Sequence, residues 1–469
     1  MSSQNNIFKN NNIYKEAVLN FVDSTLFNDT HDRYEEKLFC RKIKPQLLEK
    51  LDFSSPLKIN GISSFSALYA NRVLFAMNDT DFLYLPEDNE TLNFDDFTEF
   101  YNPARVGSAY IAMPYLENYL FSFLKDEIII SDNWDLKLVE KYFSDYANDI
   151  KNIKTSETAE AIRTSKNPKN SAKELLIQLA PDFLIESSPM ARYTPGSYGN
   201  ISSALFKVII DELGYGDFSK KHSTLFKDTL QSVGLSRTPH KYWQYYLNGS
   251  LLLANYYNMI TRVKRNIFKY IGAIYLAETT FITSCKIWMD VLKEALPGID
   301  TLYFSEHCHI DHHHSKTVLN EIVLPTIVKY GNQAANEIVR GFEEAKLIGE
   351  IADKDFIEQI AWKDNADKNI KLFKNIFEKV KKEALKGNVK TQKFLEPKGE
   401  LSITHSHDQD ELCYIRSGQM EFLNGFEKST ILKSSEGIII NKNRLHGAII
   451  QSSNCEYEIY TIENINKWL

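Results

Sequence analysis

Two kinds of hydrophobic pattern divide the chain. Up to about residue 387, apolar positions recur at the three- and four-residue spacing of helices, whereas later runs such as ELCYIRSG and EYEIYTIE alternate like strands. We therefore predict a multidomain α+β protein. Its expected parts are a helical N-terminal support or dimerisation region (1–145), an all-α helical bundle (146–335), connecting helices (336–388) and an all-β domain (389–469).

The segment FSEHCHIDHHHS holds five of the eleven histidines. If this segment is helical, His307, Asp311 and His314 share one face with apolar residues, and that face turns toward a core. On the opposite face, Glu306 and His309 form a rival pair with the Glu-x-x-His spacing of ferritin-like di-iron bundles. We favour the buried face as the metal-binding one.

Three apolar helical patterns contain or end on a glutamate, namely Glu186, Glu212 and Glu278. A buried carboxylate must be protonated, paired with a cation or bound to a metal, and a single one is typical of a core salt bridge. After Glu212, the glycines of GYGD break the helix, so that His222 returns at a new angle. Together with the buried face of the histidine segment, these residues supply four carboxylates and three imidazoles, and periodicity alone indicates a buried metal site made of carboxylates and histidines.

In order and spacing, the seven residues resemble the ligands of the heme-oxygenase-like di-iron oxidases. The GYGD turn and the H-x-x-x-D-x-x-H helix are the most specific parts of the pattern. The resemblance implies a seven-helix bundle without haem, and a di-iron centre that uses Fe(II), O2 and an external reductant. The ligands implied are Glu186, Glu212, His222, Glu278, His307, Asp311 and His314.

The stretch GELSITHSHDQDELCYIRSG fits the first cupin motif, G-x5-H-x-H-x3-E-x6-G, at every fixed position. His405 and His407 lie two residues apart on a predicted strand and therefore project from one face. A shortened second motif supplies His446. Three imidazoles leave positions open for substrate and O2 on a mononuclear Fe(II), although manganese also accepts such ligands. Glu411 is a fourth ligand, a base or a residue that orients the histidines.

A di-iron bundle followed by a cupin, behind a helical N-terminal region, is similar to the N-nitrosourea-forming metalloenzymes. This resemblance implies that the bundle hydroxylates the guanidine of Nω-methyl-L-arginine at Nδ and then at the unmethylated Nω. The cupin iron would then use O2 to rearrange the product into an N-nitrosourea. The resemblance also implies a separate electron donor and a homodimer formed through the N-terminal region.

Substrate contacts are expected in the loop ARYTPGSYG, which follows Glu186. Binding groups are often carried on loops near a site, and a methylarginine needs a cation to pair with its own carboxylate. The candidates are Arg192, Tyr193 and Tyr198.

The composition of the chain indicates which kinds of partner and which cellular compartment to expect. A net charge of −7 without a basic stripe excludes nucleic acid as a partner, and the chain has no run of the roughly 20 apolar residues that a membrane span needs. Five cysteines without a C-x-x-C pair favour a reduced compartment, so we expect a cytoplasmic protein.

Two other functions stay open. The first is a di-iron N-oxygenase or oxidase of the same fold that acts on another amine, with the cupin as an accessory or sensing domain. The second is a non-enzymatic metal-binding or regulatory protein. Buried carboxylates at these spacings argue against the second function, because regulation does not require them.

Overall fold

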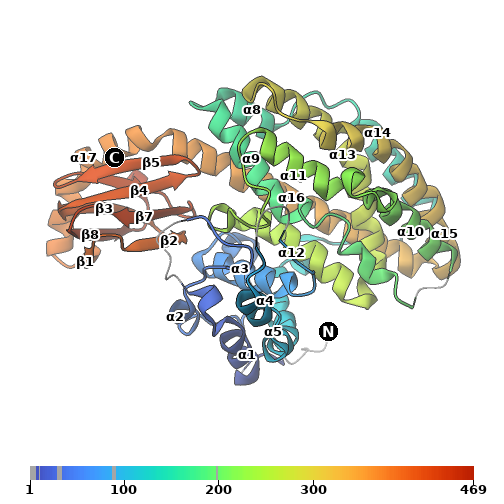
Figure 1. The fold of residues 1–469 in the computed structure, drawn as a ribbon, viewed down its shortest axis with the longest axis horizontal. Helices are drawn as coiled ribbons and strands as arrows, with labels where there is room; N and C mark the ends of the chain where they lie inside the picture. Colours follow the sequence, from blue (N-terminus) through green and yellow to red (C-terminus); the bar gives the residue numbers. More distant parts are fainter. Residues whose placement is uncertain are drawn as a thin grey trace.

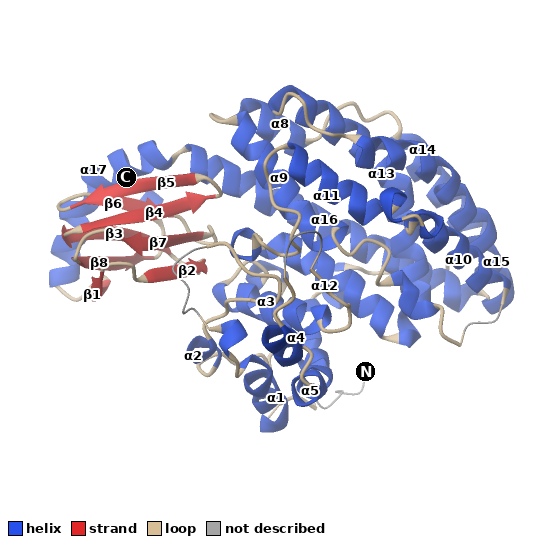
Figure 2. Cartoon of the chain, in the orientation of Figure 1, coloured by secondary structure: helices blue, strands red, loops and turns tan. Residues whose placement is uncertain are grey.

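The protein consists of a large helical body and a C-terminal pair of β-sheets, as the computed structural model shows (Figures 1 and 2). The sheets lie at one end and the helical bundle at the other, with the N-terminal helices below them in this view. The predicted α+β fold class, with a helical bundle and a C-terminal β-barrel, is confirmed. The structure describes residues 7–9, 11–28, 34–86, 91–131, 133–196 and 199–468.

The N-terminal region is helical and packs directly on the bundle. Almost every residue of helix α3 is buried, because the helix lies between α5 and the bundle helix α12. The N-terminal helices are α1 (Asn12–Val22), α2 (Pro45–Leu48), α3 (Phe65–Asp79), α4 (Phe94–Phe100), α5 (Pro103–Phe121), α6 (Leu124–Glu127) and α7 (Leu136–Ile150).

Long helices build the bundle and continue into the connection to the sheets. Helix α7 of the N-terminal region runs across the expected boundary at 145, and α16 runs across the one at 335. No helix ends at either boundary, and both domain limits stay predictions. Within the described residues, no helix is both long and apolar enough to cross a membrane. The helices are α8 (Glu157–Thr164), α9 (Pro168–Phe183), α10 (Asn200–Glu212), α11 (His222–Ser232), α12 (Asn248–Arg262), α13 (Ile267–Ala295), α14 (Leu302–Thr317), α15 (Leu324–Tyr330), α16 (Asn332–Asp364) and α17 (Ala366–Leu385).

Helices α13 and α16 cross in direct backbone contact at two glycines. A Cβ atom at Gly272 would collide with the carbonyl oxygen of Ile338, and one at Gly341 would collide with that of Lys269. Backbone atoms cannot rotate away as a flexible side chain can, so only glycine permits this close approach. The crossing fixes α13, which carries Glu278, against the longest helix of the bundle.

Eight antiparallel strands form two four-stranded sheets, with strand orders β1-β8-β3-β6 and β2-β7-β4-β5. The pairing of β2 with β7 places His405 directly opposite His446, so the register of one strand pair brings two candidate ligands together. The strands are β1 (Lys390–Pro397), β2 (Leu401–His405), β3 (Asp410–Ser417), β4 (Gln419–Gly425), β5 (Lys428–Lys433), β6 (Gly437–Ile440), β7 (His446–Ile450) and β8 (Asn454–Ile462).

The barrel is anchored to the helical body from two sides. From α16, the side chain of Gln359 hydrogen-bonds both the N–H and the carbonyl of Leu445, each at 2.9 Å. From α3, the buried Arg72 guanidinium donates to the carbonyl of Thr404 at 2.6 Å and to its hydroxyl at 2.8 Å. Both anchors therefore hold residues next to the barrel histidines.

The glycine crossing predicts opposite effects of one substitution at two positions of α16. Gly341→Ala forces a backbone clash and should lower the free energy of unfolding by about 3 kcal/mol. Gly349→Ala is the matched control, because no atom lies within 4 Å of its added Cβ, and it should raise the free energy by about 1 kcal/mol. Urea unfolding followed by circular dichroism measures both values. Equal stability of the Gly341→Ala variant and the wild type would contradict the backbone contact.

Candidate metal centres

The seven expected ligands of the bundle meet as two groups that share Glu212. Within each group, one ligand atom of every residue lies within 4.8 Å of those of the others. A carboxylate common to two ligand groups is positioned to bridge two metal ions. The groups are Glu186, Glu212, His222 and His307, and Glu212, Glu278, Asp311 and His314.

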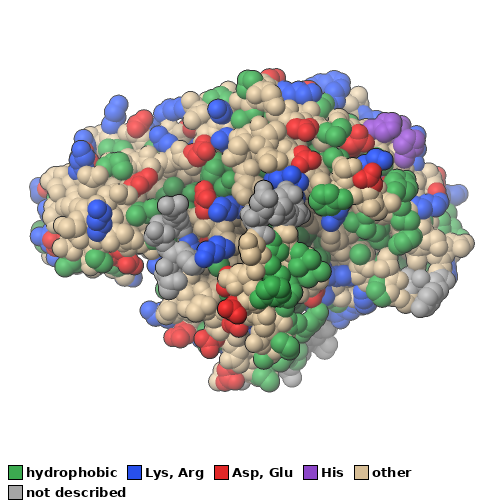
Figure 3. Space-filling model, in the orientation of Figure 1, with side chains coloured by type: hydrophobic (Ala, Val, Ile, Leu, Met, Phe, Trp, Pro, Cys, Tyr) green, Lys and Arg blue, Asp and Glu red, His purple; other side chains and the backbone are tan. Residues whose placement is uncertain are grey.

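Helix α14 supplies three of these ligands from its buried face, as the helical spacing predicts. His307, Asp311 and His314 are each at most 2% exposed. The rival pair does not reach the core, because His309 points to solvent. The exposed histidines form a patch on the surface (Figure 3), made by His309, His312 and His313.

The glycine turn after α10 returns the chain to the same centre. Gly214 has a φ of +62°, and a Cβ there would lie 2.6 Å from the backbone of Lys221, so this tight turn requires glycine. His222 then begins α11, and its Nδ1 lies 2.6 Å from Oε2 of Glu212. Neither of these two atoms has hydrogen-bond geometry toward any partner among the described residues.

Several buried ligand atoms in the centre lack a hydrogen-bond partner, which is the pattern that a bound cation would complete. Such atoms include Oε2 of Glu186 and both carboxylate oxygens of Asp311. A buried, unpaired carboxylate is strongly destabilising, and carboxylates together with imidazoles are suitable ligands for iron. The residues present therefore fit a di-iron centre.

The pKa values of the side chains in this centre reflect its many carboxylates. Burial lowers the pKa of His314, but its hydrogen bond with Glu278 and the charges of Glu278 and Glu212 raise it to about 10. Burial would raise the pKa of Glu212, whereas the adjacent His222 lowers it to about 2. Burial and then the charge of Glu278 raise the pKa of Asp311. Bound metal ions would replace the protons that balance these carboxylates.

Two residues that the sequence did not indicate orient the imidazoles. The carbonyl of Tyr303 accepts a hydrogen bond from Nδ1 of His307 at 2.9 Å, so Nε2 faces the centre. Asp211 lies 3.0 Å from Nε2 of His314 and leaves Nδ1 facing the carboxylates. Two features of the sequence point to these residues: Tyr303 lies one helical turn before His307, and Asp211 is a second acid next to Glu212.

The barrel holds a third group, made by His405, His407 and His446, whose ligand atoms also lie within 4.8 Å of one another. Burial lowers the pKa of His405 to about 4 and that of His407 to about 3, so both rings are neutral at pH 7. Nδ1 of His405 donates to the carbonyl of Ile403, and Nδ1 of His446 to that of Arg444. Their Nε2 atoms are thus free to bind a metal.

Glu411 contacts one of these histidines but does not belong to the group of three. Its Oε2 lies 3.2 Å from Nε2 of His407, and Thr461 donates to its other oxygen at 3.3 Å. Burial raises the pKa of Glu411 to about 7.

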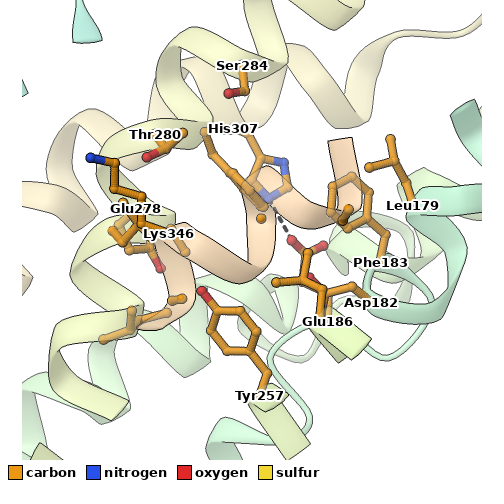
Figure 4. Close-up of a pocket in the computed structure, with 18 of the residues that line it drawn as sticks. Leu179, Asp182, Phe183, Glu186, Tyr257, Glu278, Thr280, Ser284, His307 and Lys346 are labelled. Atoms are coloured by element: carbon orange, nitrogen blue, oxygen red, sulfur yellow. Dashed lines mark hydrogen bonds and ion pairs between the residues drawn. The ribbon is translucent and has the colours of Figure 1, made fainter. Parts of the chain in front are cut away.

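A cavity of about 610 Å³ opens onto the bundle centre (Figure 4). Four ligand residues line it, namely Glu186, Glu212, Glu278 and His307. Most of the remaining wall is apolar, which is typical of a pocket for a small organic substrate. A substrate in this cavity would therefore reach the metal-binding carboxylates directly.

The expected substrate contacts after Glu186 have other partners in the structure. The guanidinium of Arg192 forms an ion pair with Asp81 at 3.0 Å, and the hydroxyl of Tyr193 donates to the carbonyl of Ile260. Neither Arg192 nor Tyr193 lines the cavity. Tyr198 lies outside the described residues. A direct role of these three in substrate binding stays a prediction.

Comparison with known proteins agrees with this chemistry. Residues 173–349 match a family described as iron-containing redox enzymes, and this segment includes all seven expected ligands of the bundle. A nitrosourea synthase from Streptomyces achromogenes subsp. streptozoticus is 38% identical over 457 residues, which cover 97% of this chain and 96% of that protein. This similarity extends over the N-terminal helices, the bundle and the barrel. The chain therefore belongs to the nitrosourea synthase family and contains its iron-containing redox enzyme domain.

Proposed function

We propose that this protein is an iron-dependent oxygenase that converts a methylated arginine into an N-nitrosourea in two stages. The proposal rests on one arrangement of side chains. Two ligand groups that share Glu212 face a cavity large enough for a small organic molecule, and a separate group of three imidazoles lies in the barrel. The relative's printed name supplies the product class. The substrate proposed is Nω-methyl-L-arginine, hydroxylated at Nδ and then at the unmethylated Nω.

The first stage belongs to the bundle. Two Fe(II) ions bound there would supply O2 activation, with electrons from an external donor. The chain's own residues hold the ions, orient the ligand rings and keep bulk water away through the apolar cavity wall. The residues proposed as ligands are Glu186, Glu212, His222, Glu278, His307, Asp311 and His314.

The second stage belongs to the barrel, where His405, His407 and His446 would hold a single Fe(II). Three neutral imidazoles leave coordination positions open for the hydroxylated guanidine and for O2. Glu411, next to His407 and with its pKa near neutrality, is placed to hold or release a proton at Oε2. Each stage is thus assigned to the site whose ligand charge suits it. The carboxylate-rich site of the bundle serves the hydroxylation, and the neutral imidazoles of the barrel bind the chelating intermediate.

The proposal includes a homodimer formed through the N-terminal helices, in the cytoplasm. Large apolar side chains are exposed on this region, including Phe94 of α4 and Tyr110 and Ile111 of α5. Exposed apolar groups on neighbouring helices support a protein interface there.

The number of irons bound per chain should depend on which ligand groups are intact. The wild type should bind three irons per chain, two in the bundle and one in the barrel. Glu212→Ala removes the shared ligand and should leave about one iron, whereas His446→Ala should leave about two. His309→Ala, on the exposed face of α14, is the matched control and should keep all three. Iron analysis after anaerobic loading measures the content. Loss of only one bundle iron in Glu212→Ala would contradict the shared role of this residue.

Product analysis should separate the two stages. Iron-loaded protein given Nω-methyl-L-arginine, a reductant and O2 should release a nitroso product. Glu278→Ala should reduce hydroxylation at least about 100-fold, because it removes a bundle ligand, and His407→Ala should stop at the dihydroxylated arginine. Glu306→Ala should behave like the wild type. Mass spectrometry identifies each species.

Two results of this experiment would count against the proposal. O2 consumption without conversion of methylarginine would move the search to other amines. A nitroso product from His407→Ala would remove the barrel from the second stage.

A further inference from the structure

The cavity beside the bundle centre carries charged side chains that the proposed metal ligation does not use. In the view of Figure 4, Lys346 lies on the left beside Glu278, and Asp182 lies on the right beside Glu186. Two further acids, Glu350 and Asp353, complete the charged part of the wall. An otherwise apolar cavity with both signs of charge at separate places suits a ligand with a similar charge distribution.

Asp182 presents an unpaired carboxylate to the interior of this cavity. It lies in the last turn of α9, four residues before Glu186, and among the described residues its side chain has no hydrogen-bond or ion-pair partner. Burial and then the charge of Glu186 raise the pKa of Asp182 to about 7. A cationic ligand group would relieve the cost of placing this carboxylate in an apolar wall.

Helix α16 provides a charged stripe on another side of the cavity. Lys346, Glu350 and Asp353 stand at i, i+4 and i+7, so they share one face of the helix, and all three line the cavity. The Lys346 ammonium lies 5.7 Å from the centre of the Tyr146 ring, and no carboxylate of the described residues lies within ion-pair distance of it. An accessible cation and two acids lie within two turns of one helix.

Gly349 lies on the same face and leaves the wall open between these charges. A glycine in a helix interior costs about 1 kcal/mol relative to alanine. Packing does not explain this cost, because no atom lies within 4 Å of a Cβ added at Gly349, in contrast to Gly341 of the same helix. The space that Gly349 leaves belongs to the cavity.

We infer that this cavity recognises a whole α-amino acid with a guanidinium side chain. Asp182 pairs with the guanidinium beside the metal ligands, and Lys346 pairs with the α-carboxylate. Glu350 and Asp353 receive the α-ammonium group, and Gly349 leaves room for the backbone of the amino acid. The planar fork of a guanidinium matches a carboxylate. This inference rests on the proposed function for the guanidine substrate, and it assigns recognition to residues other than those of the loop after Glu186.

The test compares three ligands that differ by one charge each. Nω-methyl-L-citrulline replaces the guanidinium by a neutral urea, and Nω-methylagmatine lacks the α-carboxylate of Nω-methyl-L-arginine. Calorimetry on iron-loaded protein without O2 should give about 10- to 100-fold tighter binding of methylarginine than of either analogue, as expected for charged hydrogen bonds.

Each variant should remove one preference and keep the other. Asp182→Asn should bind methylarginine and methylcitrulline about equally, whereas Lys346→Met should bind methylarginine and methylagmatine about equally. Gly349→Phe should weaken all three ligands, because the ring fills the cavity. The exposed Asp367→Asn and Lys354→Met are matched controls and should keep both preferences.

Unchanged preferences in Asp182→Asn and Lys346→Met would overturn the inference, and so would a wild type that does not bind methylarginine. A purely structural role of the two residues predicts equal weakening of all three ligands, which would also overturn it. Failure of the proposed function looks different: the wild type binds methylarginine with both preferences, but forms no hydroxylated or nitroso product when O2 and a reductant are added.

Discussion

The rest of the helical bundle depends on one constraint, which is the placement of four carboxylates close together in its interior. Glu212 is one of the four and belongs to both ligand groups. Like charges so close together in an apolar interior repel strongly, and only protons, imidazolium groups or metal ions can balance them. The fold brings these acids together from α10, α13, α14 and the turn that follows α9, and hydrogen bonds from the imidazoles to Tyr303 and Asp211 orient the rings. A centre of this composition destabilises the folded state unless it binds cations. Such destabilisation is typical of functional sites, where bound metal ions offset it.

Helix α16 connects the separate parts of the protein. It crosses α13 at Gly341, lines the cavity beside the bundle centre through Lys346 and its neighbours, and then reaches the barrel. There the side chain of Gln359 accepts a hydrogen bond from the N–H of Leu445, next to the proposed ligand His446, and the Trp362 ring lies 6.4 Å from that of His446. One continuous helix therefore contacts both the cavity proposed for the first stage and the group of histidines proposed for the second.

Much of the fold and of the candidate site follows from local patterns. Helical periodicity identified the buried face of α14, and the cupin spacing identified the barrel histidines, because both signals depend only on residues near each other in sequence. The contact of Gly272 with α16, the orienting role of Asp211 and the charged cavity wall depend on which helix faces meet, and a single sequence does not contain this information. The same reason explains why proximity to Glu186 favoured Arg192, whose guanidinium instead pairs with the distant Asp81.

The most direct test of the central claim is a crystal structure of the iron-loaded protein with anomalous diffraction data collected at the iron edge. We expect three iron positions per chain: two on either side of Glu212 inside the bundle, and a third among His405, His407 and His446 in the barrel. A single iron in the bundle, or iron held by the exposed histidines of α14 with the buried groups empty, would contradict it.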